Sequence, residues 1–162
     1  MLIVPPGAGD PIPGATLIGR AEWVDGAVCV LDQTVPPGVL VAAHIHDRET
    51  QLAYVVSGAL TFYVDGEEET VSEGGLVVRP AGSVHALWNA TDEPAHMVEI
   101  TTPATNWQAF VLELEALFAR GDAAPEELVM LTKRYGTQLA PDVTSALALR
   151  HGLNTGTGYS TD

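Results

Sequence analysis

The segment Gly38–Gly58 reads GVLVAAHIHDRETQLAYVVSG, and the segment Gly74–Asn89 reads GGLVVRPAGSVHALWN. Short apolar runs rich in valine and leucine are bounded by glycines or polar residues in the first segment and by glycine and proline in the second, which is the pattern of β-strands joined by tight turns. Between the two segments, Asp65-Gly66 separates two further runs, and this dipeptide is a strong signal for a β-hairpin. This part of the chain is therefore predicted to be a series of antiparallel strands.

The same spacing of turn residues continues on both sides of these segments, as far as Pro103. We expect strands at Ala27–Val35, Leu40–His46, Gln51–Val56, Ala59–Val64, Glu68–Val71, Leu76–Arg79, His85–Ala90 and His96–Thr101. So many consecutive strands without a helix between them indicate an all-β sandwich or barrel.

Helical periodicity begins after Pro103. Residues 105–108, TNWQ, have the pattern of a capping box, and apolar and aromatic residues then recur at helical spacing until Gly121. The aromatic side chains of this helix are expected to pack against the barrel rather than to form a cofactor site. Two more helices are expected, from Pro125 to Gly136 and from Pro141 to Gly152. The predicted organisation is a barrel (1–103), a helical extension packed on it (104–153) and a flexible tail (154–162).

Three histidines have the spacing of a metal site. His44 and His46 are two residues apart on a predicted strand, so both imidazoles leave the same face, about 6.6–6.8 Å apart along the chain. Gln51 begins the next strand and can turn its carbonyl oxygen towards the same ion, and His85 begins a later strand. The alternative is that the three histidines are metal-free core residues, but each buried ring would then need its own hydrogen-bond partner.

The two segments resemble the two sequence motifs of the cupins. The first cupin motif is Gly, five residues, His-x-His, three or four residues, Glu, six residues, Gly, and here it reads Gly38, VLVAA, His44, Ile45, His46, DRET, Gln51, LAYVVS, Gly58. The second is Gly, five residues, Pro-x-Gly, two residues, His, three residues, Asn, and here it reads Gly74, GLVVR, Pro80, Ala81, Gly82, SV, His85, ALW, Asn89. Gly75 stands where cupins commonly carry aspartate. The resemblance implies a cupin double-stranded β-helix, a jelly-roll barrel, with a C-terminal α-helical extension.

The resemblance also implies that His44, His46, Gln51 and His85 hold one divalent transition metal. Three nitrogens and one oxygen suit Fe, Mn, Ni, Co, Cu or Zn, so the ligand set does not identify the metal. This chain has Gln51 where the cupin motif has a carboxylate, and a neutral amide leaves more positive charge on the ion and cannot accept a proton. Glu49, in the turn before Gln51, is the alternative carboxylate for a ligand or a base.

Counting every second residue along the predicted strands places six more side chains on the inward face with the ligands: Leu40, Ala42, Ala53, Val55, Leu87 and Asn89. This small, mostly apolar lining would leave space above the metal for an organic substrate. On the later strand, Val98 and Ile100 are expected to be buried, and His96 is either a proton carrier at the pocket edge or a surface residue. No catalytic residue beyond these is identified.

Composition limits the expected partners. The 162 residues are enough for one domain, and 7 basic against 21 acidic residues give a net charge of −14. Such a charge repels phosphate backbones and anionic lipid surfaces, so neither nucleic acid nor a membrane is expected as a partner. The N-terminus lacks the pattern of a signal peptide, and the single Cys29 is expected to be a core residue. A cytoplasmic location is expected.

The function implied by the resemblance is that of a metal-dependent monocupin, an oxidoreductase similar to quercetin dioxygenase-like cupins. A small organic substrate would bind the metal through an enol or phenol oxygen, and dioxygen would attack the activated substrate. Two alternatives are a redox-neutral lyase or isomerase, in which the ion acts only as a Lewis acid, and a non-catalytic cupin that binds a small molecule. Cupin barrels commonly pair through edge strands and N-terminal arms, so a homodimer is expected.

Overall fold

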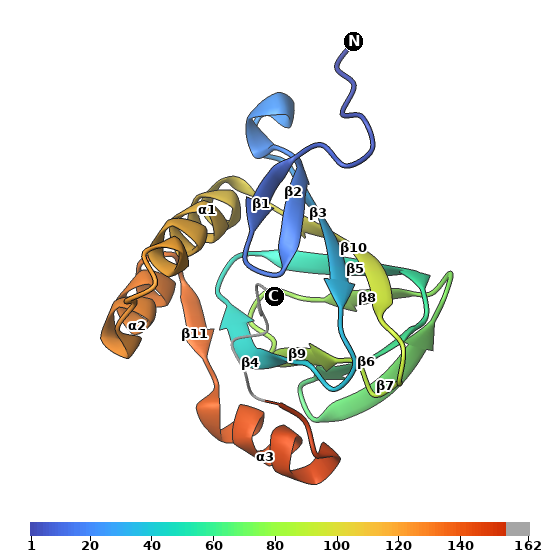
Figure 1. Ribbon diagram of the computed structural model, residues 1–162. Coiled ribbons are helices and arrows are strands. Elements are labelled where there is room, and N and C mark those ends of the chain that lie inside the picture. The colour runs from blue at the N-terminus through green and yellow to red at the C-terminus, as the bar shows by residue number, and fades with distance from the viewer. Residues whose placement is uncertain (155–162) are drawn as a thin grey trace.

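The computed structural model of this chain describes residues 1–154, so residues 155–162 of the predicted tail lie outside the described residues. Two antiparallel sheets face each other in the order β1-β2-β3-β10-β5-β8 and β11-β4-β9-β6-β7 (Figure 1). The strands are β1 (Asp10–Ile12), β2 (Ala15–Gly19), β3 (Cys29–Val35), β4 (Leu40–His46), β5 (Thr50–Ser57), β6 (Ala59–Val64), β7 (Glu67–Ser72), β8 (Leu76–Arg79), β9 (His85–Trp88), β10 (Ala95–Thr102) and β11 (Thr137–Leu139). The predicted jelly-roll fold with a C-terminal helical portion is confirmed.

The helices follow the barrel and cover it on two sides. They are α1 (Thr105–Ala119), α2 (Pro125–Arg134) and α3 (Pro141–His151), and a short 3-10 helix, η1 (Ala21–Val24), lies between β2 and β3. Figure 1 shows α1 beside the first strands, α2 next to α1 and β11, and α3 beneath the second sheet. The three helices lie where helical periodicity predicted them.

Two turns show why glycine is required at specific positions. At the β6–β7 hairpin, Asp65 and Gly66 have φ values of 48° and 101°, the left-handed conformations of a two-residue hairpin turn. At Gly75, a Cβ atom would lie 2.2 Å from Cγ1 of Val71, so no larger side chain fits there. Close packing at this turn therefore explains why glycine replaces the aspartate of the cupin motif.

The segment after Pro103 contributes a strand as well as helices. β11 pairs with β4 along the sheet, with Thr137 opposite His46 and Leu139 opposite His44. The extension therefore completes the sheet that carries all three histidines. The sequence did not predict β1, β2 or β11. β1 and β2 follow an N-terminal stretch rich in proline and glycine, and β11 has only three residues between two helices.

Three clusters of buried side chains hold these layers together. The barrel interior contains Val35, Ala53, Val55, Leu60, Phe62, Leu87, Ala95 and Met97. A second cluster lies between α1 and the first strands and includes Leu31, Trp107, Phe110 and Leu114. The third, which includes Leu40, Trp88 and Leu147, joins α3 to the outer face of the second sheet. The prediction that the aromatic residues of the first helix pack against the barrel is confirmed.

The predicted capping box at residues 105–108 is not formed by Gln108. The N-cap residue of α1 is Ala104, and the side chain of Thr105 lies outside the described residues. Gln108 instead reaches η1: its Oε1 accepts from the backbone N–H of Ala21 at 2.6 Å, and its Nε2 donates to Glu22 at 2.6 Å. The side chain that fitted the local motif therefore makes a long-range contact that ties α1 to the barrel.

The remaining features concern the core thiol and the surface. Burial raises the pKa of the Cys29 thiol to about 12, so this residue is a protonated core side chain, as predicted.

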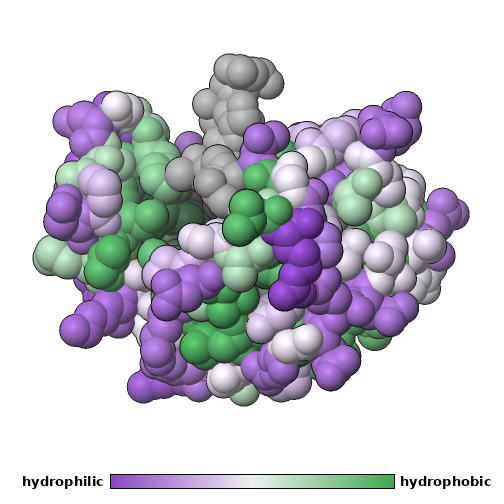
Figure 2. Space-filling model, turned by 90° about the horizontal axis from the view of Figure 1, so that it is seen from below, coloured by the Kyte–Doolittle hydropathy of each residue, from purple (hydrophilic) through white to green (hydrophobic). Residues whose placement is uncertain are grey.

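No helix among residues 1–154 is long and apolar enough to span a membrane. The face below the barrel, where α3 lies, mixes hydrophilic residues with smaller hydrophobic areas (Figure 2). Among the large apolar side chains at the surface are Met130 and Leu149.

Candidate metal centre

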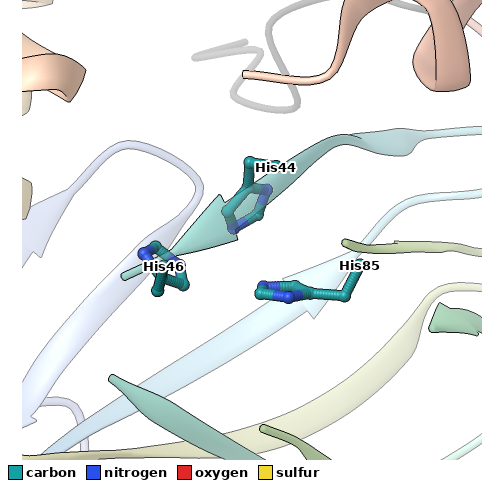
Figure 3. A group of neighbouring side chains, drawn as sticks. All are labelled: His44, His46 and His85. Atoms are coloured by element: carbon teal, nitrogen blue, oxygen red, sulfur yellow. The ribbon is translucent and has the colours of Figure 1, made fainter. Parts of the chain in front are cut away.

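The three predicted histidines meet inside the barrel. His44 and His46 project from β4 and His85 from the adjacent strand β9, where His44 and His85 are paired residues (Figure 3). One nitrogen from each ring lies within 4.8 Å of the other two. Nitrogens bound to one ion at about 2.0–2.1 Å lie at most about 4.2 Å apart, so only a small closing movement is needed for all three to share an ion.

Hydrogen bonds on the far side of each ring set its orientation. Nδ1 of His44 donates to the carbonyl oxygen of Ala42 at 2.7 Å, and Nδ1 of His85 donates to that of Ser83 at 3.1 Å. Nδ1 of His46 lies 3.1 Å from Oγ1 of Thr137 on β11. With the Nδ1 atoms engaged in this way, the Nε2 lone pairs are left for a ligand, which is the arrangement usual for metal-binding histidines.

The histidines are also in the protonation state that a metal requires. Burial lowers the pKa of His46 well below its usual range and that of His85 to about 2, and it lowers the pKa of His44 as well. All three rings are therefore neutral at pH 7. Nε2 of His46 and Nε2 of His85 are buried acceptors without a hydrogen-bond partner, an arrangement that is costly unless a cation or a donor fills the space.

Gln51 supplies a third buried acceptor. It lies on β5, in the opposite sheet, and lines the same cavity as His44. Its Nε2 donates to the carboxylate of Glu99 at 3.1 Å, and its Oε1 is buried without a partner. Because an ionised carboxylate can only accept hydrogen bonds, Glu99 fixes which end of the amide faces it and leaves the oxygen free. The three histidines offer three neutral nitrogens, a donor set that suits a divalent transition metal, and Gln51 presents its unpartnered oxygen from the wall of the cavity that His44 also lines.

The Glu99–Arg79 ion pair behind Gln51 was not predicted. Arg79 is opposite Gln51 in the β5–β8 pairing, is almost fully buried, and donates to the second oxygen of Glu99. The two charges cancel, so the ion pair adds no net charge beside the site. The sequence does contain one sign of a buried ion pair, because Glu99 is an acidic residue in an otherwise apolar strand. Its partner Arg79 comes from a distant strand, which sequence spacing cannot identify.

The inward face of β10 differs from the prediction. The buried residues of this strand are Ala95, Met97, Glu99 and Thr101, whereas Val98 and Ile100 are only partly buried on the other face. His96 shares that outer face and pairs there with Asp32, so it is not at the edge of the pocket. The prediction that Val98 and Ile100 are the buried residues is therefore wrong. It assumed that the apolar residues point inward, whereas the polar residues Glu99 and Thr101 do so.

A cavity of about 40 Å³ adjoins the site. Its walls are mainly apolar, and its polar residues are Gln33, His44, Gln51, Arg79 and Glu99. Helix α1 forms one wall, with the residues Trp107, Phe110, Val111 and Leu114. The pocket is therefore closed by a helix that lies outside the two cupin motifs.

Most of the six predicted pocket residues lie elsewhere. Leu87 lines the cavity, and Ala53 and Val55 are buried in the barrel interior without lining it. Leu40 packs against α3 and Ala42 is exposed, while Val41 takes the inward position. The cause is a β-bulge in β4. Val41 pairs with Leu87 and His44 pairs with His85, so β4 has one more residue than β9 between these two pairs. The extra residue reverses which side chains of β4 point inward.

Asn89 and Glu49 also lie outside the site. Asn89 is a structural residue, because its Nδ2 donates to the carbonyl oxygens of Val35 and Glu93. Glu49 is buried in the β4–β5 turn, and burial raises its pKa, but among the described residues it does not belong to the cluster of the three histidines. The turn carboxylate is therefore not brought to the candidate metal centre.

Comparisons with known proteins agree with this fold. The model of the cupin domain family matches residues 31–101. The chain is 31% identical to quercetin 2,3-dioxygenase of Bacillus subtilis over 70 residues, which cover 43% of this chain and 21% of that protein. It is 29% identical to germin-like protein subfamily 2 member 2 of Arabidopsis thaliana over 119 residues, which cover 70% of this chain and 53% of that protein.

A solved structure shares the architecture. The chain superimposes on a predicted oxalate decarboxylase from Thermotoga maritima with a TM-score of 0.53 and 18% identity, over 54% of this chain and 77% of that one. This similarity concerns the fold alone. The chain spans about half or less of the length of the curated relatives that it matches. The family model, the two motifs and the jelly-roll fold together show that residues 31–101 of this chain form a cupin domain.

Proposed function

We propose that this protein is a metal-dependent cupin enzyme that acts on a small organic molecule bound through oxygen. The observation that carries the proposal is the group of unpartnered buried acceptors, Nε2 of His46, Nε2 of His85 and Oε1 of Gln51, together with His44. Neutral histidines and an amide suit Fe, Mn, Ni, Co, Cu or Zn. When bound, the ion supplies positive charge that stabilises a developing oxyanion.

Within this class we propose a dioxygenase of the quercetinase type, with an enol or phenol as substrate. The support is the similarity to quercetin 2,3-dioxygenase over 70 residues, together with the apolar wall of the cavity, which suits a carbon skeleton. His44, His46, His85 and Gln51 would hold the ion, and all four are neutral, so its charge would attract an enolate or phenolate. The small cavity favours compounds much smaller than a flavonol as long as α1 stays in place.

One observation favours a redox-neutral lyase or isomerase as the second candidate. Gln51 cannot exchange a proton, and Glu99 is already engaged by Gln51 and Arg79. Neither residue is therefore placed to act as a free general base. A reaction that needs only a Lewis acid, with the substrate entering as its own anion, makes the fewest demands on such a site.

The test combines metal analysis with turnover. Protein purified without added metal or chelator is analysed for bound metals, and then incubated with small 1,3-diketones and catechols in air and under argon, with dioxygen uptake recorded. The proposal predicts one redox-active ion per chain and dioxygen-dependent consumption, both lost in His85→Ala and retained in the surface control His151→Ala. Equal turnover under argon with zinc bound would favour the lyase or isomerase, whereas metal and ligand binding without consumption would favour a binding protein.

A further inference from the structure

Trp107 brings an aromatic side chain from the helical extension to the candidate metal centre. Its ring centroid lies 4.6 Å from that of His46, with the two planes at 75°. Trp107 is only 9% exposed and lines the cavity together with His44 and Gln51. A residue of α1, which is outside both cupin motifs, therefore contacts a predicted metal ligand and the space where a substrate would bind.

The indole N–H of Trp107 has no partner. Nε1 is buried and makes no hydrogen bond in the described structure. Buried tryptophans usually satisfy this donor, and an unmade hydrogen bond costs about 1–3 kcal/mol. Arg79 also lines the cavity, and its Nε is a second buried donor without a partner. One small cavity is thus bordered by two residues with unused N–H groups and by two of the candidate metal ligands, His44 and Gln51.

The position of Trp107 is fixed from both sides. Gln108, the next residue, holds the start of α1 to η1 through Ala21 and Glu22. The ring of Phe110 lies against that of Trp107, with centroids 5.3 Å apart. Because the helix is tied to the barrel and the ring is packed, the indole is held at the cavity before any ligand arrives.

We propose that Trp107 is a positioning residue that donates its indole N–H to an oxygen of a small anionic ligand bound at the metal centre. The inference rests on the proposed metal site and narrows its substrates to compact carboxylates or enolates. The cavity of about 40 Å³ would hold roughly three water-sized groups, which matches a ligand of a few non-hydrogen atoms. Arg79, on the cavity wall, offers its unpartnered Nε–H as a second donor to the same anion.

The test uses acetate as the probe and the full-length protein loaded with Co²⁺. Acetate binding is followed by the visible absorption of the cobalt, in the wild type, in Trp107→Phe and in the control Trp23→Phe, whose tryptophan is 44% exposed. Trp107→Phe removes the donor but keeps an aromatic ring, and we expect it to weaken acetate binding by about threefold to tenfold. Co²⁺ affinity should be unchanged in both variants, and neutral acetamide should not compete with acetate.

A second measurement needs no variant at Trp107. In the zinc-loaded, ¹⁵N-labelled wild type, acetate should move the indole N–H signal of Trp107 downfield and leave that of Trp23 in place. Co²⁺ or zinc that fails to bind at one ion per chain would contradict the metal centre itself. Stoichiometric metal with no acetate binding, or with acetate binding that leaves both the Trp107 signal and the Trp107→Phe affinity unchanged, would overturn only the inference about Trp107.

Discussion

Gln51 is the residue at which this site differs from the cupin motif, and its neighbours give a physical reason. Its amide lies 3.1 Å from the carboxylate of Glu99, which also receives a hydrogen bond from Arg79. A glutamate at position 51 would bring two buried carboxylates together, and they could not both stay ionised. The amide donates to Glu99 and still offers its oxygen to the cavity. The neutral ligand and the buried ion pair are therefore parts of one arrangement.

Gln51→Glu should destabilise the metal-free protein by about 1–3 kcal/mol at neutral pH, because a hydrogen-bond donor is replaced by a second buried carboxylate. The deficit should shrink as the pH falls, since one proton relieves the repulsion. Urea denaturation in the presence of a chelator measures both effects. The matched control is Gln138→Glu, at an exposed glutamine that donates to Asp47 at 2.7 Å, where the change should stay within about 0.5 kcal/mol.

A double variant separates charge from packing at this site. Adding Glu99→Gln to Gln51→Glu leaves one carboxylate and one amide, and should recover part of the lost stability. An equal loss in the double variant, or an equal loss in Gln138→Glu, would show that carboxylate repulsion does not explain the amide at position 51.

The buried histidines predict a dependence of stability on pH. The folded-state pKa of His85 is about 2 and that of His46 is also lowered, so the unfolded chain binds protons below about pH 6.5 while the folded chain does not. In the metal-free protein, stability should therefore fall as the pH decreases from about 7 to about 5, by up to about 1.4 kcal/mol per pH unit for each such histidine. Denaturation with a chelator present measures this slope. His85→Gln should make it shallower, and an unchanged slope would contradict the assignment.

At the level of single residues, sequence spacing predicted what lies within one motif. The structure brings His44, His46 and His85 together in one cluster, as the motifs predicted. Gln51 lines the cavity next to this cluster. Arg79 and Trp107 were not assigned to the site. Each reaches it through strand pairing or helix packing, and such contacts between distant segments leave no local pattern in the sequence.

At the level of elements, the positions of most strands could be predicted, but which side chains of β4 point inward could not. β4, β6 and β8 have the predicted bounds, because valine-rich runs between glycines and prolines define where a strand begins and ends. The bulge in β4 has no such signal: Ala42 and Ala43 are small and fit either face. A single extra residue there turned Val41 inward and left Leu40 and Ala42 outside the pocket.

Helix α1 is both a structural layer and a wall of the site, and the prediction at this scale tests its packing. Leu114 is 7% exposed and lies in the cluster beneath the helix, so Leu114→Ala should lower the free energy of unfolding by about 2–4 kcal/mol. Leu149→Ala, at a leucine of α3 that is 88% exposed, should change it by less than about 0.5 kcal/mol. Chemical denaturation measures both. Similar small effects in the two variants would show that α1 is not tightly docked.

In the whole molecule, the acidic charge and the site are separated. The net charge of −14 comes largely from exposed carboxylates, whereas Glu99 at the site is neutralised by Arg79 and the histidines are neutral. An anionic substrate would therefore meet repulsion at the surface but not within the cavity, where a bound cation would attract it. The homodimer stays a prediction, and sedimentation equilibrium would test it against the mass of a single chain.

The surface charge makes the stability of the whole molecule sensitive to salt. With a net charge of −14, carboxylates spread over one small domain repel one another, and that repulsion weakens as the Debye length falls from about 30 Å in 0.01 M salt to about 8 Å in 0.15 M salt. At neutral pH we expect this change to raise the melting temperature by about 2–4 °C, equivalent to about 1 kcal/mol for a chain of this length. Calorimetry in sodium chloride with a chelator present measures the shift. Near the isoelectric point of about 4.4 the salt effect should disappear, and a rise of the same size there would mean that salt acts through something other than charge repulsion.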